Sequence, residues 1–432
     1  MLATRDSSAL DDHLSPRGVV RDLGLLILGL TACGALASPL RAQGLPDPDA
    51  SGIEHIIVVT MENRSFDHFL GWLPHADGMQ EDLTFFDESG NPHVTARLAP
   101  DYQGCSHPDP DHSYDGGRVE FDDGACDGWL LAGDNDEFSI GYYKKNDLKF
   151  LGNAARDWTT CDRYFASIMA ETFPNRVYEY AAQTDRLDNS MALSELPTIW
   201  DSLATAGVSA RYYFSDVPFV ALWGLKYLPI ARPFDDFLDD AASGSLPAVS
   251  YIDPRFIDEA SGTSADDHPH ADIRNGEKFM EQIYHAVTTG PGWSHSVLVF
   301  TYDEWGGFFD HVPPPLKAIP PADQLVGNDG RLGFRVPCVI VSPFSPQHPS
   351  HLEFEHCSIL RMIEWRWNLP PLTERDATAN NLAMALDFSL NHKPKQYSVP
   401  AGPFGGICPG SLPGGDKWES LIDLALQLGW PF

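Results

Sequence analysis

Two apolar stretches of the sequence end in pairs of oxygen-bearing side chains. Glu62 and Asn63 follow the run HIIVVTM, and Asp303 and Glu304 follow the run SVLVFTY. Ligand sites in an open parallel sheet form outside the carboxyl ends of its strands, so neighbouring strands would bring these four side chains together. The alternative is that each pair lies alone at a solvated loop.

Three carboxylates buried in one place repel one another and are costly to remove from water. A hard divalent cation would neutralise them, and ligands that are all oxygens favour Ca²⁺, Mg²⁺ or Mn²⁺ over Zn²⁺. The sequence therefore predicts one divalent metal ion bound by Glu62, Asn63, Asp303 and Glu304. We expect Ca²⁺, with Mg²⁺ or Mn²⁺ as alternatives.

Thr172 lies in the segment AETFPNR, just before a predicted helix that has Pro174 in its first turn. A threonine at such a place is commonly an N-cap. Alternatively, its hydroxyl is a nucleophile whose target phosphate is held by the positive end of the helix. A metal ion bound to its oxygen would then lower the pKa of the hydroxyl. Arg176 would bind the same phosphate in a bidentate manner, or else form a structural salt bridge.

Histidines occur beside aspartates in three predicted loops. His112 lies in PDHSYDGG, His268 and His270 lie in DDHPHAD, and His311 lies in DEWGGFFDHVPPP. Carboxylate–histidine pairs orient imidazoles so that they bind phosphate or protonate a leaving group. Chance clustering of surface histidines is the alternative.

The elements that would position these residues alternate along the chain. Apolar runs of strand length are separated by amphipathic helical patterns, which predicts an αβα sandwich around a mostly parallel central sheet. Residues 84–147 are rich in Asp, Gly, His and aromatics and form a predicted loop-rich excursion beside the sheet. The predicted strands are 55–60, 209–214, 248–252, 296–302 and 338–341, and the predicted helices are 276–289, 357–367 and 418–428.

The N-terminus resembles an export signal. Residues 23–37 are apolar and follow Arg17 and Arg21, and the run is too short to span a membrane comfortably. The segment ALA, ending at Ala37, would allow cleavage and release, whereas LTAC would leave Cys33 as a lipid anchor. We expect a secreted, periplasmic or lipid-anchored protein, with residues 1–50 as signal and disordered segment and residues 51–432 as one catalytic domain.

Charge and cysteine usage fit an exported protein. The formal net charge of −32 over 432 residues argues against nucleic acid as a partner and against electrostatic attachment to an anionic membrane. Membrane contact is expected only through a substrate or an anchor at Cys33. The six cysteines after Cys33 are compatible with disulfides, and we expect Cys105–Cys126 and Cys357–Cys408, with buried free thiols as the alternative.

Four segments together resemble the bacterial phosphoesterase family that holds phosphatidylcholine-type phospholipases C and the acid phosphatase AcpA. The segments are MENRSFDHFLG, T-x-PNR, DDHPHADIR and TYDEWGGFFDHVPPP, and the resemblance covers roughly residues 53–369. The family is similar in fold to alkaline phosphatases and sulfatases. No C-x-P-x-R segment supplies the nucleophile of a sulfatase.

The resemblance implies a role for each candidate residue. Glu62, Asn63, Asp303 and Glu304, with Thr172, would hold the metal ion, and Thr172 would form a phospho-threonine intermediate. Phosphate-binding and acid–base roles would fall to His112, His268 and His311. His270 stands where the family has proline, and His356 is a weaker match to the family pattern.

The sequence thus predicts an exported, metal-dependent phosphoesterase. Phosphodiesters with phospholipid or phosphorylcholine-type head groups are the expected substrates. An acid phosphatase acting on monoesters is the first alternative, because the shared core handles the phosphoryl group while variable loops read the alcohol. A non-catalytic, metal-stabilised surface binding protein is the second alternative. The sequence does not indicate an oligomeric state.

Overall fold

The computed structural model describes residues 44–257, 259–409 and 417–431. The chain divides into two units, Met1–Gln43 and Gly44–Phe432. The predicted signal segment, with Cys33 and Ala37, lies outside the described residues. Leu45 packs against the hydrophobic core, so the compact unit begins before the boundary predicted at residue 50.

A seven-stranded sheet forms the centre of this unit, in the order β6-β12-β11-β1-β10-β8-β9. Strands β11, β1, β10, β8 and β9 are parallel, and β12 is antiparallel to both of its neighbours. The five predicted strands are all present, and their ends differ from the prediction by one residue at most. The bounds are β1 His55–Met61, β6 Thr159–Thr160, β8 Ala210–Phe214, β9 Ala231–Pro233, β10 Val249–Asp253, β11 Ser296–Tyr302 and β12 Cys338–Val341.

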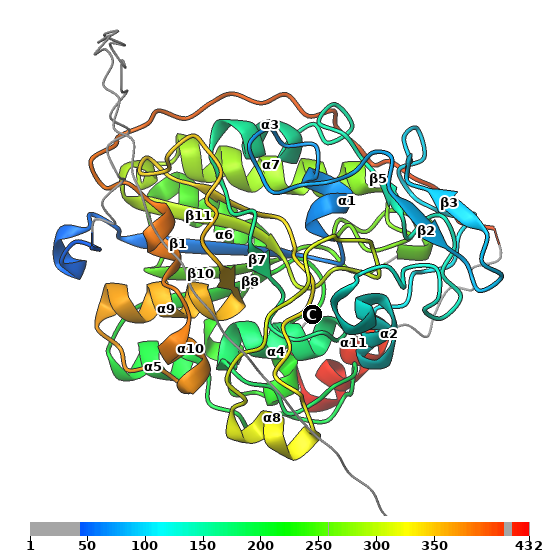
Figure 1. The fold of residues 1–432 in the computed structure, drawn as a ribbon. Coiled ribbons are helices and arrows are strands. Elements are labelled where there is room, and N and C mark those ends of the chain that lie inside the picture. The colour runs from blue at the N-terminus through cyan, green and yellow to red at the C-terminus, as the bar shows by residue number, and fades with distance from the viewer. Residues whose placement is uncertain (1–43, 258, 410–416, 432) are drawn as a thin grey trace, which may run out of the picture. The chain divides into compact units, whose positions relative to one another are not determined.

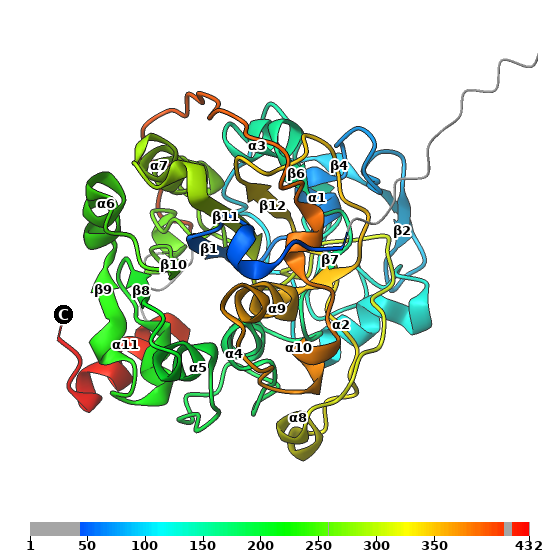
Figure 2. The same ribbon diagram turned by 90° about the vertical axis from the view of Figure 1, so that its left-hand side faces the viewer.

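Helices cover both faces of the sheet, as Figures 1 and 2 show. Helices α3 (Leu151–Asp157), α6 (Phe234–Ser243) and α7 (Ile273–Thr289) lie on one face, and α4 (Thr172–Ala181), α5 (Ile199–Thr205) and α9 (His356–Trp367) lie on the other. The predicted αβα sandwich is therefore confirmed. Because helices cover both faces, β1 and β11 are almost wholly buried and read as continuous apolar runs.

The remaining elements are short, apart from the last helix. Residues 84–147, the excursion expected from the sequence, contain short strands, short helical segments and loops, and an aromatic cluster packs Trp129 and Ile140 against Trp305 and Phe309, which follow β11. This contact ties the excursion to the carboxyl end of the sheet (Figure 1). The elements are α1 Phe66–Leu70, β2 Thr84–Phe86, β3 Pro92–Val94, β4 Ala96–Arg97, α2 Tyr114–Phe121, β5 Gly141–Tyr142, β7 Tyr164–Phe165, α8 Pro321–Val326, β13 Phe354–Glu355, α10 Glu374–Thr378 and α11 Lys417–Leu428, with 3-10 turns η1 Pro48–Ala50, η2 Asp122–Gly124, η3 Phe219–Trp223, η4 Leu228–Ile230, η5 Glu259–Ser261, η6 Trp293–His295 and η7 Leu382–Ala385.

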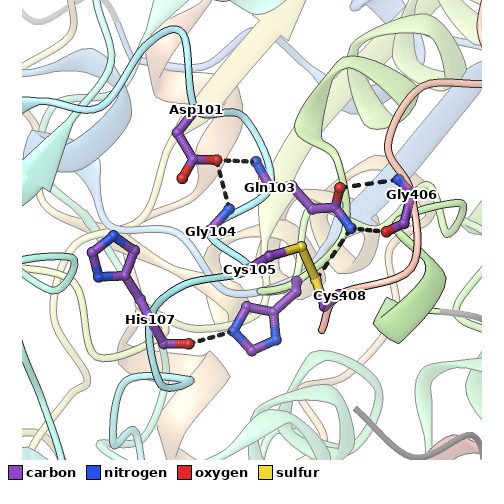
Figure 3. Close-up of a disulfide and its surroundings, with 8 residues drawn as sticks. Asp101, Gln103, Gly104, Cys105, His107, Gly406 and Cys408 are labelled. Carbon is purple, nitrogen blue, oxygen red and sulfur yellow. Dashed lines mark hydrogen bonds between the residues drawn. A yellow bond between two sulfur atoms is a disulfide. The ribbon is translucent and has the colours of Figure 1, made fainter. Parts of the chain in front are cut away.

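One disulfide joins Cys105 to Cys408, so both predicted pairings are wrong. Cys357 lies in the buried face of α9, and Cys126 lies in the aromatic cluster of the excursion, where burial raises its pKa to about 12. Both act as small apolar side chains, which an even cysteine count does not reveal. Figure 3 shows the disulfide beside Gln103, whose Nε2 donates to Gly406 O at 2.6 Å.

Among the described residues, no helix combines the length and the apolarity that crossing a membrane requires.

Glu277 of α7 gives the fold a pH dependence that can be tested. Its buried carboxyl accepts hydrogen bonds from the N–H groups of Phe150 and Leu151 at the start of α3. Burial raises its pKa from 4.5 to about 8, so the folded chain holds this proton more tightly than the unfolded chain. The resulting stability is complete below pH 4.5 and is lost as the pH rises through 8.

We therefore expect the free energy of unfolding of the wild type to fall from about pH 5 to about pH 8 relative to that of Glu277→Gln, as measured by urea denaturation. Glu281→Gln changes a carboxylate on the same helix that pairs with Lys278, and it should follow the wild-type profile. Parallel profiles for the wild type and Glu277→Gln would contradict the prediction.

Candidate active site

The carboxyl ends of β1 and β11 lie side by side. Met61 pairs with Tyr302 in the parallel register, and Asp303 N donates to Met61 O at 3.1 Å. Glu62 and Asp303 therefore leave the sheet at adjacent positions, and their side chains are fully buried. The structure thus brings the two predicted pairs of metal ligands together and excludes solvated, separate loops.

Tight turns hold the second residue of each pair. Asn63 has a φ of 62°, a left-handed conformation that asparagine tolerates better than most residues. Its N–H donates to Asp303 Oδ1 at 3.4 Å. A Cβ atom at Gly306 would lie 2.3 Å from Asn63 O, and Gly306 itself has a φ of +65°. Glycine is therefore required where the two turns cross.

Thr172 is the first residue of α4, and its side chain points at the same group of oxygens. Its Oγ1 donates to Glu62 Oε1 at 2.9 Å and lies 3.4 Å from Asn63 Oδ1. The N-cap position belongs to Glu171, so Thr172 is not the N-cap that the sequence allowed. The hydroxyl instead lies between the predicted metal ligands and the positive end of a ten-residue helix.

The buried oxygens are of the chemical type that a hard divalent cation binds. Glu304 Oε2 accepts from Gly306 N at 2.6 Å, but Glu304 Oε1 is buried without a hydrogen-bond partner. Burial, with the nearby charge of Glu62, raises the pKa of Asp303 to about 7. Burial and the adjacent Asp303 raise the pKa of Glu304 well above its ordinary value. A cation bound by Glu62, Asn63, Asp303, Glu304 and Thr172 would relieve this repulsion.

Two further acids beside Glu62, Asp266 and Glu259, were not predicted from the sequence. Asp266 O accepts the backbone N–H of Glu62 at 2.7 Å. Carboxylate oxygens of Glu62, Asp266 and Glu259 all lie within 4.8 Å of one another, and Asp266 Oδ2 has no hydrogen-bond partner. The DDHPHAD segment therefore contributes an acid to the site as well as His268.

The last helix also reaches this group, which the sequence did not indicate. Lys417 Nζ lies 3.1 Å from Glu62 Oε1 and donates to Thr172 Oγ1 at 3.0 Å. Trp418 Nε1 donates to Glu62 Oε2 at 3.0 Å. Neither residue lies in a recognisable motif, and both follow a Gly- and Pro-rich stretch, so no signal in the sequence would have found them.

His112 and His268 lie together at the edge of the group of predicted metal ligands. His112 Nδ1 donates to Pro110 O at 2.7 Å, which directs Nε2 toward Asn63 Nδ2 at 3.5 Å and Glu304 Oε1 at 3.9 Å. The two imidazole rings are 5.8 Å apart. Burial holds the pKa of His268 well below its ordinary value, so His268 is neutral.

The structure places His270 and His311 differently. His270 Nε2 donates to His107 O at 2.9 Å, so the ring is held by the backbone. His311 Nδ1 contacts Asp67 Oδ2 at 2.5 Å and His311 Nε2 lies 3.3 Å from Asp77 Oδ1. The described contacts of His311 do not reach the oxygens around Thr172, and its predicted role at phosphate stays a prediction.

Of the two roles expected for Arg176, phosphate binding or a structural salt bridge, the contacts of its guanidinium correspond to the salt bridge. Its guanidinium is fully buried and donates to Asp303 Oδ2 at 3.0 Å, to Asp253 Oδ1 at 2.8 Å and to Thr60 O at 3.2 Å. His356 Nε2 donates to Asp303 O at 2.7 Å, and burial lowers the pKa of His356 to about 3. Arg176 thus fixes the carboxylate of Asp303, and His356 fixes its backbone carbonyl.

Known proteins identify the family. The profile of the Phosphoesterase family matches residues 53–370. The chain belongs to the Phosphoesterase family. It is a hydrolase that acts on phosphoric ester bonds, as the resemblance in its sequence implied.

Named relatives include phospholipases. Non-specific phospholipase C1 of Arabidopsis thaliana is 32% identical over 387 residues, which cover 80% of this chain and 72% of the relative. Phospholipase C B of Mycobacterium tuberculosis (strain ATCC 25618 / H37Rv) is 30% identical over 456 residues, which cover 85% of each chain.

Similar solved structures share little sequence with this chain. A protein of the alkaline phosphatase superfamily from Vibrio parahaemolyticus has a TM-score of 0.38 at 7% identity and covers 77% of this chain and 70% of its own. The phosphonate monoester hydrolase of Agrobacterium radiobacter has a TM-score of 0.36 at 10% identity and covers 74% of both chains. Because both TM-scores are below 0.5, the fold class rests on the sheet and the helices described above.

The role of Arg176 can be tested by stability. Arg176→Leu leaves Asp303 and Asp253 buried without their ion pair, so we expect a loss of about 3–5 kcal/mol in the free energy of unfolding, measured without added metal. Arg232→Leu is the control, because within the described residues the guanidinium of Arg232 donates to the carbonyls of Pro229 and Ala231, in its own segment. Its effect should stay within about 0.5 kcal/mol. Equal losses in the two variants would contradict a structural role for the Arg176 ion pairs.

Proposed function

We propose that this protein is an exported, metal-dependent phosphodiesterase of phospholipase C type that uses Thr172 as its nucleophile. The observation that carries the proposal is the position of Thr172 Oγ1. It lies at the N-terminus of α4, 2.9 Å from Glu62 Oε1 and 3.4 Å from Asn63 Oδ1. The phospholipase C names of the relatives favour a phosphodiester over a phosphomonoester.

The first half-reaction transfers the phosphoryl group to the protein. Thr172 Oγ1 forms a bond to phosphorus, and the bond from phosphorus to the oxygen of the leaving alcohol breaks. The hydroxyl proton leaves along the hydrogen bond to Glu62 Oε1. The departing oxygen takes a proton from the imidazolium of His112, whose Nε2 faces this group of oxygens.

The second half-reaction releases the phosphate ester. Neutral His112 accepts a proton from water, whose oxygen attacks phosphorus while the bond to Thr172 Oγ1 breaks and Oγ1 recovers its proton. Neutral His268 lies 5.8 Å from His112, and its Nε2 can accept a hydrogen bond from the attacking water. A divalent cation, Ca²⁺ by preference for this oxygen set, would stabilise charge on the phosphoryl group and lower the pKa of the Thr172 hydroxyl.

Two features support export. Residues 23–37 have the length and apolarity of a signal segment. Disulfides such as the one between Cys105 and Cys408 persist in oxidising compartments, which include the periplasm and the extracellular space.

Substrate class and metal dependence can be tested in one assay. We expect the protein to hydrolyse p-nitrophenylphosphorylcholine faster than p-nitrophenyl phosphate. EDTA should abolish the turnover, and Ca²⁺ in excess should restore it. Faster turnover of the monoester would favour an acid phosphatase. Metal-dependent thermal stabilisation without turnover of either compound would favour a binding protein.

The nucleophile can be tested by substitution. Thr172→Ala should lower kcat by at least about 10³-fold, because the covalent route is lost. Thr172→Ser keeps a hydroxyl and should retain part of the activity. Thr198→Ala is a matched control, since Thr198 is also buried at a helix start but caps α5. Full activity of Thr172→Ala on the better substrate would remove Thr172 from this role.

A further inference from the structure

We propose that Lys417, the first residue of α11, is a catalytic residue that binds the transferring phosphoryl group. The proposal rests on the proposed function for the identity of the reacting atom. The Lys417 ammonium donates to Thr172 Oγ1 at 3.0 Å and lies 3.1 Å from Glu62 Oε1. A phosphorus atom bonded to Oγ1 would carry its free oxygens within reach of this ammonium group.

The first residues of two helices contact each other. Thr172 is the first residue of α4 and Lys417 is the first residue of α11, and their side chains are hydrogen-bonded to each other. The partial positive charge at the N-terminus of α4 therefore lies where the Lys417 ammonium is held. With a full ammonium charge added there, this place is suited to an oxyanion.

The charge balance of the site also calls for a cation here. Glu62, Asp303 and Glu304 supply three buried carboxylates, so a divalent cation leaves the ionised set negative, and a phosphodiester adds a further negative charge. Arg176 is committed to Asp303 and Asp253. Within the described part of the chain, Lys417 is the cationic side chain hydrogen-bonded to the Thr172 hydroxyl, and it is placed to offset the repulsion of the substrate.

Packing holds α11 in this position. Trp418 donates to Glu62 Oε2 and stacks on Phe256, with ring centroids 3.7 Å apart and an interplanar angle of 13°. Phe173, the neighbour of Thr172, contacts the same indole at 5.4 Å. Lys417 itself is only 12% exposed. The ammonium is thus positioned in advance rather than carried on a freely moving side chain.

The competing role is that of a counter-ion. Lys417 would then only neutralise Glu62 while no metal is bound, and a divalent cation would displace it. Loss of the ammonium would weaken phosphate binding if Lys417 binds phosphate, and would strengthen metal binding if Lys417 is a counter-ion. Both affinities can be measured without turnover.

The test uses Lys417→Met, which keeps most of the side-chain volume, and Lys417→Arg, which keeps the charge. With Ca²⁺ bound, inorganic phosphate should bind Lys417→Met about 10- to 100-fold more weakly than the wild type by calorimetry. Its kcat on p-nitrophenylphosphorylcholine should fall about 10²- to 10³-fold, while Ca²⁺ affinity stays within about threefold. Lys417→Arg should recover part of both losses.

Lys226→Met is the control, because Lys226 pairs with Asp201 at an exposed site, and it should leave phosphate and Ca²⁺ binding unchanged. Unchanged phosphate affinity in Lys417→Met, together with at least tenfold tighter Ca²⁺ binding, would overturn the proposal in favour of a counter-ion. A wild type that binds phosphate through Lys417 but hydrolyses no phosphodiester would refute the proposed function and would leave Lys417 as a phosphate-binding residue without a catalytic role.

Discussion

The parallel pairing of β1 with β11 places buried like charges beside one another, and the rest of the site is arranged around that constraint. Because Met61 lies opposite Tyr302, the carboxylates of Glu62 and Asp303 leave the sheet at neighbouring positions. Their repulsion has to be compensated within the protein. Arg176 of α4 neutralises Asp303, and Lys417 of α11 neutralises Glu62.

The hydrogen-bond donors are distributed so that one carboxylate oxygen of the predicted metal ligands has no donor. Asp303 receives donors from Arg176, from Glu304 N and from Asn63 N. Glu62 receives them from Thr172, Lys417 and Trp418. Among the side-chain oxygens of Glu62, Asp303 and Glu304, Glu304 Oε1 is the one left buried without a donor, and His112 Nε2 lies 3.9 Å from it. A cation and a phosphoryl group would complete what the protein leaves unsatisfied.

Much of this arrangement could be predicted from short stretches of sequence. The apolar runs before Glu62 and Asp303 are continuous because helices cover both faces of the sheet, and this pattern fixed the strands to within one residue. Thr172 could be singled out because Pro174 and the helical pattern after it marked the start of a helix. These signals are local, so neighbouring residues are enough to show them.

The features that could not be predicted depend on contacts between distant segments. Lys417 and Trp418 reach Glu62 only through tertiary packing, and nothing in their own neighbourhood marks them. His311 lies in a specific motif, yet it pairs with Asp67 and Asp77, in and after α1, rather than with the residues around Thr172. The partner of Cys105 lies 303 residues away, and an even number of cysteines does not select among pairings.

The hydrogen bond from Trp418 to Glu62 has a consequence for the order in which the protein is made. Glu62 follows the first strand of the sheet, whereas α11 follows every other described element in chain order. Until α11 has been synthesised, the carboxylate of Glu62 lacks two of its three side-chain donors, Lys417 and Trp418. The hydrogen bonds around Glu62 and Thr172 are therefore complete only when the two ends of the compact unit have met.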